Sequence, residues 1–147
     1  MQPAVHRPWA RGMPRGCRGQ SLVEMAVALP LILILMAGVL DLAQAYSLAG
    51  ILANGAREGA RYGANHATDA DVEARVVQEA AGAPLTLVAT DVTVTRHCTS
   101  VSFDPTNCDS AGSSLTVEVT YTPPLILSQA LGLPAPTIRR HATMVIF

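Results

Sequence analysis

The chain has 147 residues and a formal net charge of -1, which leaves room for one modest domain and little for a second independent core. Four arginines precede every acidic residue, namely Arg7, Arg11, Arg15 and Arg18. They lack the interleaved aromatic side chains and folded platform of a nucleic-acid-binding surface, so we expect no nucleic-acid partner.

Residues 1–19 form a basic leader. They contain three prolines, three glycines and four arginines, with almost no aliphatic side chains. Such a composition buries too little apolar surface to fold, so we predict a disordered segment. Arginines before an apolar stretch also mark the cytoplasmic side of a membrane span.

The next stretch, "SLVEMAVALPLILILMAGVL" (21–40), is almost entirely aliphatic. About 20 helical residues at about 1.5 Å each cross the hydrocarbon core of a bilayer. Glu24 and Pro30 interrupt this stretch. Pro30 lacks a backbone donor and frees the carbonyl of Ala26, so we predict a bend there.

The helical pattern continues without proline beyond residue 40, which predicts one long helix from about Ser21 to Gly63. Its first half would lie in lipid and its second half in water. Two ladders of small residues follow helical spacing in the second half: Ala45, Ala49 and Ala53, and Gly55, Gly59 and Gly63. A helical glycine costs about 1 kcal/mol relative to alanine. That cost favours close approach of another backbone, and fraying of the helix end is the alternative.

The pattern of residues 65–147 predicts a small α+β domain. "ATDADVEARVVQEAAG" (67–82) is typical of a short helix with Thr68 or Asp69 as N-cap and Gly82 as its stop. Residues 85–97, 114–122 and 137–147 alternate with a period of two, which predicts a three-stranded antiparallel sheet with one covered face. Residues 123–136, "PPLILSQALGLPAP", would form an apolar loop or short helix.

Cys98 and Cys108 lie in the part of the chain expected outside the cytoplasm, where disulfides persist. We predict a bridge that closes a short loop and contributes about 2 to 3 kcal/mol; two free thiols are the alternative. His97 beside these cysteines does not make a zinc site, because a structural site needs four ligands and no fourth stands nearby.

No catalytic pattern stands out. The sequence has no nucleophile elbow, HExxH, CxxC or phosphate-binding glycine loop, and its histidines are scattered: His6, His66, His97 and His141. We therefore predict a protein that is not an enzyme and that has neither cofactor nor metal.

Residues 18–64 carry a family resemblance. "RGQSLVEMAVALPLILILMAGVLDLAQAY", followed by "ANGAREGARYGA", resembles the TadE-like family of pilin-related proteins from tight-adherence type IV pilus systems. A leader ending in glycine, a Val-Glu pair, a proline within the apolar stretch and an Ala-Arg-Glu-Gly-Ala-Arg sequence recur in that family. This chain departs from many members at Met25, where they carry an aromatic residue.

The resemblance implies that prepilin peptidase cuts between Gly19 and Gln20, which makes Glu24 the fifth residue of the mature protein. In a pilin bundle the α-amine of an adjacent subunit would meet the Glu24 carboxylate and set the axial register. A solvated carboxylate at the headgroup level is the alternative reading. Cyclisation of an N-terminal Gln20 would remove that amine.

The resemblance also implies a role for Arg57, Glu58 and Arg61, which would lie on the aqueous half of the long helix where it packs under the sheet. The spacing of Glu58 and Arg61 allows an ion pair. Such a pair contributes little stability at a surface.

Together these inferences predict a single-pass protein of the cytoplasmic (inner) membrane with a cytoplasmic N-terminus. Its parts would be a cleaved leader (1–19), a pilin-like helix (20–64) and an extracytoplasmic domain (65–147). It would serve as a minor pilin-like (pseudopilin) subunit or assembly factor, with prepilin peptidase, other pilin-like subunits and pilus assembly proteins as partners. Whether it enters the filament stays open.

Two other readings remain. Signal peptidase could cut after "AQA" (43–45), before Tyr46, and release a soluble domain. An uncut signal anchor displaying a binding domain is the second alternative.

Overall fold

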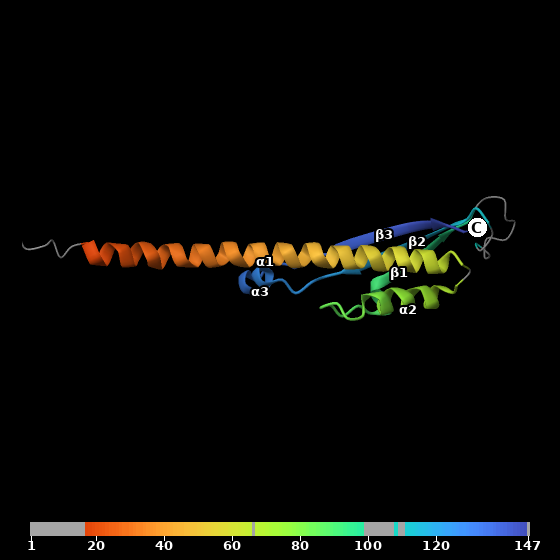
Figure 1. The fold of residues 1–147 in the computed structure, drawn as a ribbon, viewed down its shortest axis with the longest axis horizontal. Helices are drawn as coiled ribbons and strands as arrows, with labels where there is room; N and C mark the ends of the chain where they lie inside the picture. Colours follow the sequence, from red (N-terminus) through yellow and green to blue (C-terminus); the bar gives the residue numbers. More distant parts are fainter. Residues whose placement is uncertain (1–16, 66, 99–107, 109–110, 147) are drawn as a thin grey trace, which may run out of the picture. The chain divides into compact units, whose positions relative to one another are not determined.

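A computed structural model describes residues 17–65, 67–98, 108 and 111–146 of the chain (Figure 1). Residues 1–16 of the predicted leader (1–19) and most of the loop before the second strand lie outside the described residues. Residues 17–19 of the leader, which we predicted to be disordered, belong to a helix because the apolar helix extends backward through them. The chain divides into two compact units, Met1–Met36 and Ala37–Phe147. A long helix precedes a small domain with a short helix and a three-stranded antiparallel sheet, so the predicted α+β class is confirmed.

The long helix α1 spans Cys17–Gly63 and contains Pro30. It ends at the predicted residue but begins at Cys17, before the expected Ser21. The last proline before this point in the sequence is Pro14, so no residue between it and the apolar stretch lacks a backbone donor, and the helix can extend backward.

The domain core lies between α1, the short helix α2 (Asp69–Ala80) and the sheet. Apolar positions of α1 recur every four residues on one face, which places that stripe against the domain. The core residues are Leu52, Ala56 and Ala60 of α1, Val72, Val76 and Ala80 of α2, and Leu115, Val117 and Val119 of the sheet.

Helix α2 begins with a capping box. Asp71 donates its backbone N–H to Thr68 Oγ1 at 3.3 Å, and Thr68 donates its own N–H to Asp71 Oδ2 at 3.3 Å. These two bonds satisfy donors that a helix start leaves free, and they confirm Thr68 as the N-cap. The helix ends at Ala80, and Gly82 follows with a φ of 97°, which is accessible to glycine without strain.

The sheet has the order β1-β2-β3 and is antiparallel throughout. Its strands are β1 (Val92–His97), β2 (Ser114–Tyr121) and β3 (Ile138–Val145). On the central strand, Leu115, Val117 and Val119 are fully buried while the residues between them are only partly covered. The predicted alternation with one covered face is therefore present.

The first strand is shorter than predicted, because residues 85–91 are not part of it. Ala89–Asp91 form the 3-10 turn η1. The Asp91 carboxylate accepts the backbone N–H of Val88 at 3.1 Å, and this local bond holds the chain in a turn where the alternating pattern had suggested an extended strand.

Residues 123–136 contain the short helix α3, Ile126–Leu131, which ends at Gly132 with a φ of 64°. Of the two predicted options, loop or short helix, the structure contains the helix. Prolines on both sides, at positions 123, 124, 134 and 136, limit its length.

Candidate functional site

The start of α1 carries the residues of the predicted processing site. Gly19, Gln20 and Glu24 all lie in the helix and are exposed. Gln20 Nε2 donates to Glu24 Oε1 at 3.3 Å. Among the side chains that the structure describes, no other group hydrogen-bonds to the Glu24 carboxylate, so none of these described side chains neutralises its charge.

The apolar part of α1 is uncovered within its own unit. From Gly19 to Met36 every residue is exposed, including Leu29, Leu31 and Leu33 at more than half of their full accessible area. Residues 25–40 contain no charged side chain. Gly19–Gly63 is a helix long and apolar enough to cross a membrane, and exposed apolar surface on this scale calls for lipid or partner helices.

The glycine ladder on α1 faces the domain. A Cβ on Gly55 would lie 3.5 Å from Val76 Cγ1, an ordinary contact, whereas a Cβ on Gly59 would clash with Val76. A Cβ on Gly63 would clash with Leu115. The near neighbours of these glycines are side chains of α2 and β2 in the same domain, together with the backbone carbonyl of Val76, which would lie 3.7 Å from a Cβ on Gly55.

Glu58 is the centre of an ion-pair cluster on α1. Arg61 donates through Nε at 3.0 Å and through Nη2 at 2.8 Å to the two carboxylate oxygens, so the predicted pair is present. Arg75 of α2 adds a third hydrogen bond, from Nη2 to Glu58 Oε1 at 2.9 Å. Sequence spacing within α1 could not reveal this link to α2.

The two arginines lower the pKa of Glu58 to about 2 from its ordinary value of 4.5, with Arg61 as the larger cause and Arg75 second. Glu58 in turn raises the pKa of Arg61. Hydrogen bonds to the charged form favour that form. The cluster therefore stays ionised over the whole physiological pH range.

An open groove of about 630 Å³ adjoins this cluster. It is lined by Asn54, Arg57, Glu58 and Arg61 of α1, Glu79 of α2, and His141, Ala142, Thr143 and Met144 of β3. Arg57 has no hydrogen-bond or ion-pair partner among the described residues, so its guanidinium is available to an external group. Acidic and basic side chains line the groove together, and this mixture does not define one ligand class.

A contact that sequence reasoning missed joins α1 to α3. The Asp41 carboxylate is buried and accepts the backbone N–H groups of Ile126 and Leu127, each at 2.8 Å. Leu125, the N-cap residue of α3, has no side-chain cap hydrogen bond, so Asp41 caps this helix from a distance. A Cβ on Gly38 would lie 3.4 Å from Leu127 Cδ1, which shows how closely the two helices pack.

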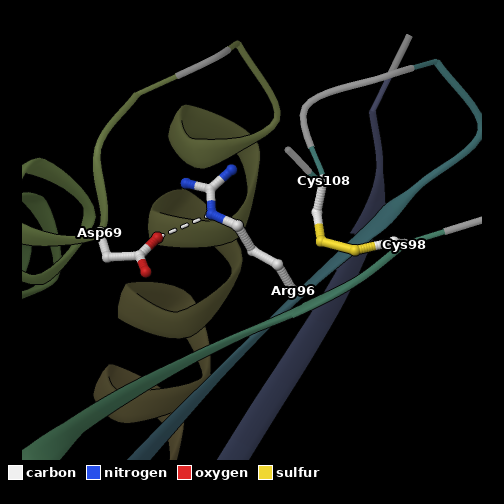
Figure 2. The surroundings of a disulfide bond; sticks show 4 residues. All are labelled: Asp69, Arg96, Cys98 and Cys108. Atoms are coloured by element: carbon white, nitrogen blue, oxygen red, sulfur yellow. Dashed lines mark hydrogen bonds and ion pairs between the residues drawn. A yellow bond between two sulfur atoms is a disulfide. The ribbon is translucent and has the colours of Figure 1, made fainter. Parts of the chain in front are cut away.

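The predicted disulfide between Cys98 and Cys108 is present, with Cα atoms 4.6 Å apart. It follows β1 directly, next to Arg96, whose side chain reaches α2 (Figure 2). Arg96 Nε donates to Asp69 Oδ1 at 2.7 Å, and Arg96 Nη2 donates to the carbonyl of Ala67 at 2.6 Å. The two contacts of Arg96 hold the end of β1 against the start of α2, whereas the bridge closes the loop that follows β1.

No group of three or more histidine, cysteine or acidic side chains capable of holding a metal ion occurs among the described residues. The described side chains at the clusters above are ion pairs, caps and packing contacts, which can position and bind but offer no assembled nucleophile and base.

Most of helix α1 is similar to a known protein family. Residues 19–61 match the TadE-like protein family. The recognition predicted from residues 18–64 is therefore confirmed over this segment. No curated protein and no solved structure matches the chain.

The TadE-like segment contains most of the predicted site residues, from Gly19 to Arg61, but ends before α2 and the sheet. The family match suggests a protein associated with a tight-adherence pilus system. The candidate membrane helix near the N-terminus fits a single-pass membrane protein. Asp41 also lies within the TadE-like segment, whereas its partner α3 lies outside it.

Proposed function

We propose that this chain is a minor pilin-like subunit or assembly factor of a tight-adherence pilus or a related secretion machine. The observation that carries the proposal is the TadE-like match over residues 19–61. This stretch contains both the exposed apolar part of α1 and Glu24 near its start. The role is mechanical: the helix holds the protein in the membrane until it packs with other pilin-like helices.

The proposal assigns a part to each stretch of the chain. Prepilin peptidase would remove residues 1–19 by cutting after Gly19, and residues 20–64 would form the membrane and assembly helix. Residues 65–147 would stand outside the cytoplasmic membrane, because the arginines before the apolar stretch are retained inside. Pro30 would bend the helix within the membrane.

Glu24 would set the register between neighbouring subunits. A carboxylate in lipid needs a cation, and the neutral Gln20 amide, its described partner at 3.3 Å, does not supply one. The α-amine of an adjacent subunit, released by cleavage after Gly19, would provide the missing charge.

Release of a soluble domain by signal peptidase is the alternative, and one contact counts against it. A cut before Tyr46 would remove Asp41 from the domain. The N–H groups of Ile126 and Leu127 would then lose their acceptors, which destabilises α3.

The first test is the intact mass of the protein purified from its native membrane. We expect a chain that starts at Gln20, with a loss of one ammonia if its amine has cyclised. A start at Tyr46 would identify the secreted alternative. An intact Met1 would identify an uncut anchor and would remove the basis for Glu24 as a subunit contact.

The second test replaces Glu24 with Ala and measures pilus output and membrane insertion. We expect normal insertion and at least a several-fold loss of surface pili, because the register contact is gone. Glu73→Ala, at a carboxylate of α2 with no described partner, is the matched control and should leave pili unchanged. Normal pilus output from Glu24→Ala would refute the register role.

A further inference from the structure

The segment that joins β2 to β3 presents apolar side chains without any charge. Residues 122–137 contain no Asp, Glu, Lys or Arg. Within this segment Ile126, Leu131 and Leu133 are 51%, 58% and 57% exposed. A concentration of exposed aliphatic side chains in an uncharged segment marks a surface that is covered in the working protein.

The structure fixes where this segment lies along α1. The Asp41 carboxylate binds two N–H groups of α3 at 2.8 Å, and Leu127 packs beside Gly38. Helix α3 accordingly lies next to α1 in Figure 1. All of these residues belong to the same compact unit, which begins at Ala37.

Residues 38–41 are the turn of α1 in which the apolar stretch ends. Twenty helical residues, 21–40, cover about 30 Å, the thickness of a hydrocarbon core. Asp41 therefore falls at the extracytoplasmic boundary of that core once the helix is inserted. Tyr46 is 83% exposed and lies about 8 Å further along α1, at the depth where aromatic side chains gather at membrane surfaces.

We propose that residues 123–136, the α3 segment, rest in the outer boundary between acyl chains and headgroups, with Ile126, Leu131 and Leu133 in contact with lipid. The occupant is the bilayer itself, because the segment has no charged side chain that would specify a protein partner, and because it is tied to the last apolar turn of α1. A zwitterionic membrane suffices, since no basic residue calls for anionic lipid.

The consequence is a second membrane attachment for the domain. Because α1 is part of the domain core, a single span through α1 leaves only the tilt of the domain against the membrane undetermined. Contact through α3 would restrict that tilt and fix which side of the domain faces the membrane. This inference depends on membrane insertion of α1, which is part of the proposed function, and does not depend on a role in pili.

Tryptophan fluorescence in vesicles tests the contact. The single native tryptophan, Trp9, is first replaced by Phe. The full-length chain then receives one reporter at a time: Leu131→Trp in the α3 segment, Leu33→Trp in the apolar stretch, or Thr95→Trp on the exposed edge strand β1. Each variant is reconstituted into phosphatidylcholine vesicles whose acyl chains carry bromine, which quenches nearby tryptophan.

We expect quenching at position 131 at least threefold stronger than at position 95. Leu133→Trp, outside α3, should give the same result if Leu131→Trp disturbs the helix. Quenching at position 33 but not at 131 or 133 would overturn the proposal while leaving membrane insertion intact. Absence of quenching at position 33 would overturn insertion itself, and with it this proposal.

A protein occupant has a different signature. If positions 131 and 133 are shielded both from brominated lipid and from aqueous iodide, a second copy of the chain covers the segment, and the lipid assignment is wrong.

Discussion

At the scale of single residues, two carboxylates of α1 tie the helix to different elements. Asp41 accepts two N–H groups of α3, and Glu58 accepts hydrogen bonds from Arg61 and from Arg75 of α2. Asp41 is buried and Glu58 is half-buried. Both side chains exchange water for charge-assisted or backbone hydrogen bonds, which offsets the cost of covering a charge.

The Glu58 cluster predicts a pH-dependent stability. The pKa of Glu58 is about 2 in the fold, against an ordinary 4.5, so ionisation favours the folded state above the ordinary value. That contribution disappears as the pH falls from about 4.5 to about 2. Glu58→Gln should lower the Tm by at most a few degrees near neutral pH, and the difference should shrink through that window.

Thermal unfolding of the detergent-solubilised full chain between neutral pH and pH 2 measures this effect. Glu73→Gln controls for the loss of one carboxylate from the domain. A Tm difference between wild type and Glu58→Gln that stays constant over the acid range would show that the cluster is not linked to folding.

Asp41 predicts a local effect on α3. Asp41→Ala should speed hydrogen exchange at the amides of Ile126 and Leu127 roughly tenfold, for a loss of about 1 to 2 kcal/mol. Asp41→Asn keeps one acceptor oxygen and should lie between wild type and Asp41→Ala. Equal exchange in all three proteins would mean that the carboxylate does not hold α3.

At the scale of elements, α1 meets different surroundings along its length. Its apolar half is exposed in its own unit, whereas the face from Leu48 to Ala60 packs into the domain core. The glycines mark this change. Gly50 has no neighbour within 4 Å of an added Cβ, while Gly59 has no space for one beside Val76.

Gly59→Ala should therefore destabilise the domain. Overpacking against the branched Val76 side chain costs about 1 to 3 kcal/mol, which exceeds or offsets the roughly 1 kcal/mol that alanine gains in a helix. Gly50→Ala is the matched control and should stabilise by up to about 1 kcal/mol. Urea unfolding compares the two; equal stabilisation by both substitutions would refute close packing at Gly59.

At the scale of the whole molecule, the Cys98–Cys108 bridge limits the unfolded chain. The two cysteines are 10 residues apart in sequence, and closing a loop of this size contributes about 2 to 3 kcal/mol by restricting the unfolded ensemble. In the fold, the bridge adjoins the Arg96–Asp69 pair that joins β1 to α2 (Figure 2).

Replacing both Cys98 and Cys108 with Ser should therefore lower the free energy of unfolding by about 2 to 3 kcal/mol. Urea titration under oxidising conditions measures it, and Cys17→Ser is the control that leaves the bridge intact. An unchanged midpoint in the double variant would show that the bridge adds no stability.

Most of the elements could be predicted from the sequence, because helix and strand periodicity, the Thr68 cap and the proline limits around α3 are local properties of the chain. The long helix, the antiparallel sheet, the disulfide and the TadE-like segment all follow from such patterns. The predicted length of the first strand was too great, because the chain forms a turn at Asp91 although its apolar and polar residues alternate there.

Only the tertiary structure decided which partners meet. Asp41 and Ile126 are 85 residues apart, and Glu58 and Arg75 are 17 apart. An apolar stripe in the sequence indicates that another surface covers it, and a lone carboxylate indicates that a donor binds it. Neither pattern identifies the partner. Those partners are set by how α1, α2 and the sheet share one core, because burial of the apolar faces fixes the arrangement and the polar contacts follow from it.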